Sequence, residues 1–219
     1  MSAAARAHDV KPEVRGVKLP NHEHERHPWV IAEIAPDFRL LDAWALPVQG
    51  GAEDFPALLE LMNGMDPTSG SSSWPTRALF SLRHHMGSWF GWDDPNRKLS
   101  IPGCTETSLS VRVPEQLRDD DTPAKSISSS TFIPIYRTAN EAAAEISNGT
   151  VHGVMHLGWV EQGDGAYRGQ MSVYVKPRGA LGEAYMSLIG PFRHLIVYPA
   201  MMRQIQRAWD ARPSQPDER

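Results

Sequence analysis

Apolar and polar side chains alternate along two stretches of the chain, residues 150–159 and 167–175, and a glycine-rich turn separates them. A period of two is typical of β-strands, and Gly163-Asp164-Gly165 supplies residues that tight hairpin turns favour. A turn centred on Asp164 pairs residues whose numbers sum to about 328, as in an antiparallel hairpin. The pattern therefore predicts a two-stranded ribbon with a defined register.

The two faces of this ribbon differ in polarity. The odd-numbered positions are apolar and the even-numbered positions are polar. The first set includes Met155, Leu157, Trp159 and Met171, and the second includes His152 and His156. We expect the apolar face to pack on the C-terminal helix and the polar face to stay in contact with solvent. A one-residue bulge would invert this assignment beyond it.

A long helix is predicted after the ribbon. Large apolar residues recur there at spacings of three and four, at Leu181, Tyr185, Leu188, Phe192, Leu195 and Ile196, and the stripe continues at Met202, Ile205 and Trp209. Pro191 and Pro199 lack the N–H that a helix needs, so we expect a kink or a restart at one or both. The simpler interpretation of the apolar residues is core packing, and the sharper one is that they wall a ligand cavity.

The other segments switch irregularly between the two periods. Strands are predicted at 38–46, 108–113 and 131–137, and helices at 54–64, 75–90 and 141–146. Pro134 favours an edge or bulge position for the third of these strands. Because strands and helices do not alternate regularly, the order predicts an α+β fold, with an antiparallel sheet and helices on one face.

The proline-bounded, polar N-terminal region predicts a flexible arm over residues 1–28, which is either laid over the domain or left free. We expect a single α+β domain over 29–211 and a disordered tail over 212–219. A chain of 219 residues is long enough for one domain with a substantial core.

The composition excludes several classes of function. The formal net charge of −4 and the absence of a long Lys/Arg run argue against nucleic acid or an anionic membrane as the main partner. No window approaches the roughly 20 apolar residues of a membrane-spanning helix, and the N-terminus lacks the order of a signal peptide. Cys104 is the single cysteine, so no intrachain disulfide forms, and we expect a cytoplasmic protein. The sequence leaves open whether the protein forms a homodimer.

Two groups of histidines invite a metal interpretation, and both are disfavoured. His152 and His156 have the spacing of a zinc helix, but in a strand their rings lie about 13 Å apart and cannot share an ion. His22, His24 and His27 lie in the predicted arm, where no regular element holds them. Cys104 has no evident base nearby in the sequence. We therefore expect no metal and no cofactor.

Arg193, His194 and Tyr198 are the strongest candidates for chemistry. His194 and Tyr198 are four residues apart on the predicted helix, so their side chains are neighbours. All three flank the apolar stripe, where a polar group can orient a ligand. We predict them as catalytic residues and Tyr136 as a further polar contact. The simpler interpretation is a structural hydrogen bond to backbone or loop.

Several stretches resemble a known bacterial family, called "domain of unknown function two-eight-six-seven". They are Val151–Trp159, Tyr167–Met171, Val175–Pro177, Pro191–His194 and Tyr198-Pro199, with His27–Trp29 and Asp37–Asp42 resembling the family's entry region. The resemblance spans about residues 27 to 210. Some relatives carry this domain behind a nucleotide-binding reductase-like domain.

This family is similar to the START and Bet v 1-like group, so the resemblance implies a helix-grip fold. In that fold a curved antiparallel sheet grips a long C-terminal helix, and a cavity takes hydrophobic small molecules. The short helix predicted at 141–146 departs from this pattern. The wider group includes lipid carriers, polyketide cyclases and hydrolases, so fold alone does not select a function.

Two functions follow as hypotheses. The first is binding of a hydrophobic or aromatic small molecule between sheet and C-terminal helix, with a cofactor-free cyclase, isomerase or lyase as its catalytic form. The polar contacts would be those named above, and the walls would be Met155, Leu157, Trp159, Met171 and Tyr185. The second is a non-catalytic carrier, or an interaction module that docks on a reductase. A titratable group within reach of the cavity would distinguish an enzyme from a carrier.

Overall fold

The computed structural model describes residues 14–65, 107–117, 132–147 and 151–212, without the side chains of Leu181 and Tyr185. The helix predicted at 75–90, Cys104 and the tail beyond residue 212 lie outside this part of the chain. So does the wall contact predicted for the Tyr185 side chain.

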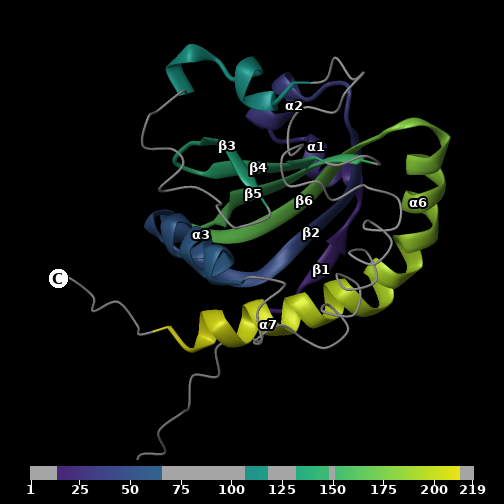
Figure 1. Cartoon of the computed structure of the whole chain (residues 1–219). Coiled ribbons are helices and arrows are strands. Elements are labelled where there is room, and N and C mark those ends of the chain that lie inside the picture. Colours follow the sequence, from purple (N-terminus) through teal and green to yellow (C-terminus); the bar gives the residue numbers. More distant parts are fainter. Residues whose placement is uncertain (1–13, 66–106, 118–131, 148–150, 213–219) are drawn as a thin grey trace, which may run out of the picture.

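Within the described residues, six strands form one antiparallel sheet in the order β1-β2-β6-β5-β4-β3. Their bounds are β1 Val17–Leu19, β2 Arg39–Gly50, β3 Ile133–Arg137, β4 Glu141–Ser147, β5 Val151–Gly163 and β6 Ala166–Pro177. β3 is an edge strand with a register shift between Pro134 and Tyr136, as Pro134 predicts. The sheet is strongly twisted (Figure 1), and its combination with a long C-terminal helix confirms the predicted α+β class and is consistent with a helix grip.

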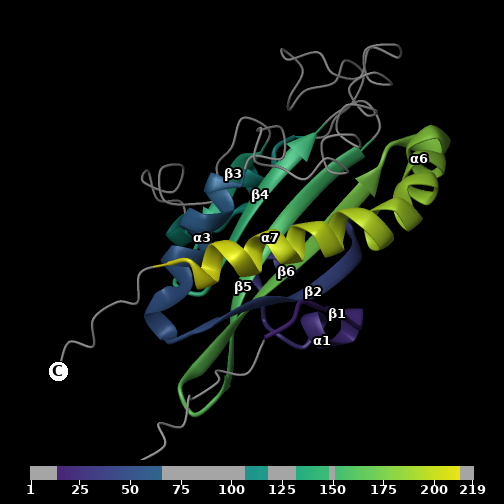
Figure 2. The same ribbon diagram turned by 90° about the horizontal axis from the view of Figure 1, so that it is seen from below.

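Helices lie on both faces of the sheet, whereas the sequence predicts them on one (Figure 1). One face carries α3 Phe55–Gly64 and the C-terminal helix. That helix consists of α6 Gly179–Phe192, a π-helical turn η5 Arg193–Val197, and α7 Tyr198–Asp210. The other face carries α1 Asn21–Glu25, α2 Val30–Ile34 and the short 3-10 turns η3 Leu109–Arg112 and η4 Glu115–Leu117. Viewed from below, α7 crosses the strands of the sheet (Figure 2).

The β5–β6 hairpin has the predicted register. Leu157 pairs with Met171 and His156 pairs with Ser172, and the one register shift lies at the tip, between Glu161 and Gly163. Gly163, Asp164 and Gly165 all have positive φ, at 107°, 51° and 73°. Glycine adopts that conformation without strain, which is why this tripeptide turns the chain so tightly.

The apolar face of the hairpin packs on the C-terminal helix, as predicted. Leu157 and Met171 belong to one hydrophobic core with Tyr198, Met202 and Ile205 of α7. Phe55 and Leu58 of α3, on the same face of the sheet, belong to this core as well. Burial of each such aliphatic side chain contributes roughly 1.5–3 kcal/mol. The helix is therefore held on the sheet mainly by hydrophobic contact.

The polar face of the hairpin is also buried, which corrects the expectation that it faces solvent. His152 and His156 are 1% and 0% exposed. A second core covers them, and it contains Trp29, Ile31, Ile34 and Phe38 from around α2 and Leu109 from η3. The N-terminal region supplies most of this cover: within the range for which the sequence predicts a flexible arm, β1 pairs with β2, and His24 of α1 is fully buried.

Two predicted elements are wrong. Residues 141–146 form strand β4 and no helix, because β4 pairs with β3 on one side and β5 on the other. Alanine and glutamate favour helix locally, but strand pairing on both sides overrides that weak preference. The strand predicted at 108–113 is the 3-10 turn η3, which the Ser108 side chain caps by accepting a hydrogen bond from the Ser110 amide.

The C-terminal helix bends at its prolines, as predicted. Pro191 lies inside α6 and Pro199 in the first turn of α7, and the wider π-helical turn lies between them. Figure 1 shows α6 running past the end of the sheet before α7 passes across it. Because α6 has little sheet to pack against, Leu188 and Leu195 are 73% and 76% exposed. The predicted stripe is thus wrong at Leu188, Phe192 and Leu195 and correct from Met202 onwards.

Candidate functional site

Three of the residues predicted as catalytic converge on one carboxylate, that of Asp42 in β2. The Arg193 Nη2 atom donates a hydrogen bond to Oδ2 of Asp42 at 2.7 Å, and the Tyr198 hydroxyl donates to the same oxygen at 3.1 Å. The Nε2 atom of His194 lies 3.1 Å from Oδ1 of Asp42, and the Lys18 ammonium lies 3.3 Å from that oxygen. We call these five residues the Asp42 cluster.

Local backbone features place the cluster. A register shift between Leu40 and Asp42 interrupts the β2–β6 pairing, and Asp42 and Trp44 then lie on the helix side of the sheet. Arg193 and His194 lie in the π-helical turn, and Tyr198 is the first residue of α7. Single π turns are frequent at functional sites, since they change which side chains face inward.

Asp42 is 1% exposed, so its charge needs compensation. Arg193 provides the closest positive group, and its side chain is 12% exposed. The ion pair is therefore shielded from water, whereas Lys18 is half-exposed and its charge is partly screened.

Trp44 adds an aromatic surface to the cluster. Its ring centroid lies 5.0 Å from that of Tyr198 and 6.3 Å from that of His194, the latter in a stacked arrangement. The Arg193 guanidinium lies 5.9 Å from the Tyr198 ring centroid. Polar groups and aromatic faces thus share one small volume, where the C-terminal helix meets the sheet.

Two buried donors, one in the Asp42 cluster and one in the adjoining Trp44 side chain, lack a hydrogen-bond partner among the described residues. They are Nε1 of Trp44 and Nε of Arg193. Oδ1 of Asp42 likewise accepts no hydrogen bond there, although the Lys18 ammonium and the His194 ring approach it. Buried polar groups are nearly always paired, and an unpaired one costs about 1–3 kcal/mol. Three such atoms in and beside one cluster suggest a site that functions with a further partner.

Burial and neighbouring charges shift the pKa values of two groups of the cluster, His194 and Tyr198. Burial lowers the pKa of His194. The charge of Asp42 opposes this shift, whereas the charges of Lys18 and Arg193 lower the pKa of His194 further. Burial raises the pKa of Tyr198 well above its usual range, and the Asp42 charge adds to this. His194 is therefore neutral near pH 7 and Tyr198 is protonated, which are the states that proton transfer by imidazole and hydrogen bonding by phenol need.

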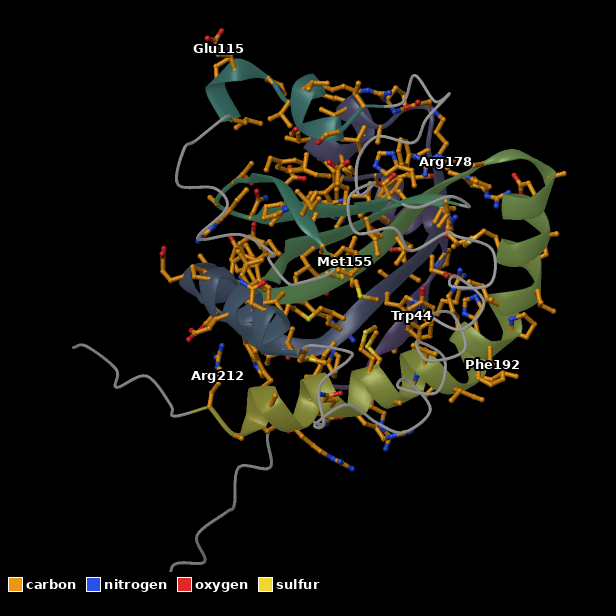
Figure 3. The ribbon with its side chains drawn as sticks, in the orientation of Figure 1. Trp44, Glu115, Met155, Arg178, Phe192 and Arg212 are labelled. Carbon is orange, nitrogen blue, oxygen red and sulfur yellow. The ribbon has the colours of Figure 1, made fainter. Side chains whose placement is uncertain are left out.

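The predicted wall residues lie on the same face of the sheet as the cluster. Leu157, Trp159 and Met171 are buried in the core between sheet and helices, and Met155 packs against it. Figure 3 shows Trp44 and Met155 between the sheet and the C-terminal helix. Met171 pairs with Trp44 across β2 and β6, which connects the walls to the polar cluster.

Tyr136 is not part of this arrangement. Its ring is in the core on the opposite face of the sheet, and its hydroxyl donates a 2.7 Å hydrogen bond to Glu141 Oε2. Burial and the nearby Glu141 charge raise the pKa of Tyr136 well above its usual range. The structure therefore separates Tyr136 from Arg193, His194 and Tyr198, with which the sequence groups it.

The opposite face carries a buried polar network. His156 Nε2 lies 2.9 Å from Glu141 Oε2, and His156 Nδ1 lies 3.2 Å from the Ser172 hydroxyl. Ser172 Oγ is also 3.1 Å from Nε2 of His24, which lies 2.9 Å from the Tyr174 hydroxyl. The order serine, histidine, glutamate is that of a catalytic triad, but Ser172 and His156 are both 0% exposed. A substrate cannot reach a hydroxyl under this cover, so we interpret the network as structural.

His152 has a carboxylate of its own. Its Nε2 lies 2.8 Å from Glu145 Oε2, and Glu145 also accepts hydrogen bonds from the Ser108 hydroxyl and the Leu109 amide. The two β5 histidines thus serve separate pairs, as the strand geometry predicts. In the N-terminal group His24 is buried, while His22 is exposed. No cluster of three or more metal-ligating side chains occurs within the described part of the chain.

Sequence reasoning missed Asp42, although the pattern contains a signal for it. In the series Phe38, Leu40, Asp42, Trp44, Leu46, every second position is apolar except Asp42. A charged residue at an inward position of a strand needs a buried partner, and the conspicuous cation on the C-terminal helix is Arg193. Glu141 and Glu145 were missed for another reason, because their segment was predicted as a helix.

One family model matches this sequence, described as "Protein of unknown function (DUF2867)", over residues 34–200. The chain belongs to this family. The DUF2867 match includes Asp42, Trp44, Arg193, His194 and Tyr198, and leaves out Lys18 and most of α7. No curated protein and no solved structure matches the chain. Among the described residues, no helix is sufficiently long and apolar to cross a membrane.

Proposed function

We propose that this DUF2867 protein binds a hydrophobic or aromatic small molecule between the sheet and the C-terminal helix, beside the Asp42 cluster. The apolar side of the ligand contacts the face that carries Met155, Leu157 and Met171. The polar side contacts Trp44 and Arg193. The observation that carries the proposal is the set of unpaired buried polar atoms within and beside a cluster that five residues from three distant segments build.

The catalytic form of the proposal is a cofactor-free cyclase, isomerase or lyase. His194 is the proton-transfer group, because it is neutral near pH 7 and borders Asp42 and Trp44. Arg193 polarises the ligand through its charge and its unpaired Nε–H, and the Tyr198 hydroxyl, which donates to Asp42, accepts a hydrogen bond from the ligand. Asp42 is a positioning residue, since its two oxygens hold the cationic and hydroxyl groups around it.

Native mass spectrometry of the protein purified from its source tests the proposal. We expect an additional mass in the 100–1,000 Da range, roughly the size of pocket ligands, that is lost on denaturation. The Trp44→Ala variant should retain much less of it, and the His22→Gln variant, altered at an exposed site, should retain as much as the wild type. An equal amount of bound mass in Trp44→Ala, or none in the wild type, would contradict the proposed site.

The alternative is a non-catalytic carrier that uses the same site. Once a retained molecule is identified, the His194→Gln variant separates the two. An enzyme loses its turnover while the ligand still binds, because glutamine keeps much of the shape and cannot titrate. A carrier shows no turnover in the wild type, and the variant changes affinity alone.

A further inference from the structure

The Asp42 cluster contains more positive than negative charge. One carboxylate, that of Asp42, faces two permanent cations, with Lys18 Nζ at 3.3 Å and Arg193 Nη2 at 2.7 Å. These three are also the charged groups that act on His194. With His194 neutral, the cluster has a formal surplus of one positive charge. The surplus is the charge of Lys18, which is half-exposed and lies beside the buried Arg193–Asp42 pair, and a local excess of this sign favours an anionic partner.

The unpaired nitrogens lead to the same chemistry. Nε1 of Trp44 and Nε of Arg193 are hydrogen-bond donors and cannot accept. Both side chains lie against the Tyr198 ring, with centroid distances of 5.0 Å for Trp44 and 5.9 Å for the Arg193 guanidinium. Their missing partner is therefore an acceptor, and hydrogen bonds to an ionised acceptor are about twice as strong as neutral ones.

An apolar surface begins next to these donors. Asp42 pairs with Val173, and Val173 pairs with Met155, so an apolar row continues across the sheet on the helix side. Val173 and Met155 are only partly buried, whereas Met171 and Leu157 of the next row are at most 1% exposed. A ligand that satisfies the donors at one end thus meets hydrocarbon at the other.

We infer that the ligand of this site is an apolar molecule with a carboxylate group, which pairs with Arg193 and Trp44 while its hydrocarbon part lies along Val173 and Met155. This inference rests on the proposed function and names the class of its ligand. Asp42 does not exclude the carboxylate, because its own charge is already matched by Arg193. The remaining positive charge of Lys18 then balances the ligand.

Binding of matched acids and amides tests the inference. We would titrate the full-length protein at pH 8 with 2-naphthoate and 2-naphthamide, and with decanoate and decanamide, by isothermal calorimetry. Each acid should bind at least about tenfold more tightly than its amide, because only the acid carries the charge. Raising the salt concentration should weaken the acids and leave the amides unchanged.

Two variants remove one contribution each and leave the Arg193–Asp42 pair in place. Lys18→Met removes a half-exposed cation, and Trp44→Phe removes a donor while it keeps an aromatic ring. Each should reduce the preference for the acid several-fold. Arg39→Met is the matched control, because Arg39 is an exposed cation on β2, the strand that carries Asp42, and its partner is Glu183. It should leave the preference unchanged.

The outcomes distinguish the two proposals. If amides bind as tightly as acids, or if Lys18→Met and Trp44→Phe keep the full preference, the carboxylate inference is overturned and the proposed site stands. If none of the four compounds binds and the purified protein retains no molecule, the proposed function itself is overturned. A tenfold preference for the acids that is reduced in both variants supports the carboxylate inference and the proposed function.

Discussion

Arg193, in the π-helical turn, donates a 2.7 Å hydrogen bond to Asp42, which precedes it by 151 residues on β2. The pair connects the bend of the C-terminal helix to the middle of the sheet. Both side chains are largely buried, so removal of one partner leaves the other as an uncompensated charge. The same contact fixes the side chain that we propose to bind the ligand.

Replacement of Asp42 by asparagine should therefore lower the stability of the protein strongly. The asparagine side chain keeps the size of the aspartate and loses the charge that Arg193 and Lys18 face. We expect the free energy of unfolding to fall by about 3–5 kcal/mol, as for other buried ion pairs that lose one member. Urea unfolding followed by tryptophan fluorescence measures it.

Glu183→Gln is the matched control for that experiment. Glu183 pairs with Arg39 at 3.4 Å, also between the C-terminal helix and β2, but both side chains are more than half exposed. Exposed pairs contribute about 0–1 kcal/mol, so this variant should unfold close to the wild type. An equal decrease in the free energy of unfolding in the two variants would mean that burial does not make the Asp42–Arg193 pair more important for stability than an exposed pair.

The hairpin was predictable to the residue, because two independent signals agree there. The period of two sets the faces, and Gly163-Asp164-Gly165 sets the register. Strand β4 was not predictable in the same way. Its Glu-Ala-Ala-Ala-Glu sequence favours helix, and only pairing with two neighbouring strands makes it extended.

The burial of the second sheet face depends on distant contacts. His156 looks like a solvent-facing residue until α1 and α2 cover it, and the short, proline-flanked sequences of those helices carry no periodic signal. For the site, the sequence predicted Arg193, His194 and Tyr198 together. It did not identify their common partner, because Asp42 is far away in the chain and becomes a neighbour only when α7 crosses β2.

Gly158 allows the close contact of that cover with the sheet. A Cβ atom at Gly158 would lie 2.6 Å from Cη2 and 2.9 Å from Cζ2 of Trp29, which is too short for any real contact. Gly158→Ala should therefore displace the Trp29 ring and lower the free energy of unfolding by about 1–3 kcal/mol. A Cβ at Gly190 of α6 meets no atom within 4 Å, so Gly190→Ala should be neutral or stabilise by up to about 1 kcal/mol. Thermal unfolding of both variants checks this, and a shift of equal sign in the two would contradict it.

The two halves of the C-terminal helix should respond differently to truncation. Ile205 of α7 is fully buried in the core with Leu157 and Met171, and Ile205→Ala should cost about 2–5 kcal/mol. Leu195, just before α7, is 76% exposed, and Leu195→Ala should change the stability by no more than about 0.5 kcal/mol. Chemical denaturation measures both. A large loss for Leu195→Ala would show that the apolar stripe packs as the periodicity alone predicts.

Mild acid should destabilise the protein through His24. Burial, and then the nearby His156, lower the pKa of His24 to about 4, against about 6.5 for an unfolded histidine. The folded state therefore binds the proton less readily than the unfolded state. The stability from neutral His24 is complete above about pH 6.5 and is lost progressively as the pH falls toward 4, by about 3 kcal/mol for His24 alone. Urea unfolding at several pH values measures this slope.

His24→Gln should make the slope between pH 6.5 and 4 shallower, because glutamine does not titrate, whatever its effect on the stability at pH 7. Burial also lowers the pKa of His156, which accounts for the slope that remains. His22→Gln, two residues earlier on the same helix, should leave the slope unchanged, since His22 is exposed. Protonation of Glu141 and Glu145 does not produce the decrease in stability between pH 6.5 and 4. Burial acts to raise the pKa of each carboxyl, but the hydrogen bonds from His156 and His152 outweigh it and hold both pKa values below their usual range. The stability that these carboxylates contribute is therefore lost only at more acidic pH. A slope of undiminished size in His24→Gln would contradict the prediction and assign the acid sensitivity to another histidine of the network.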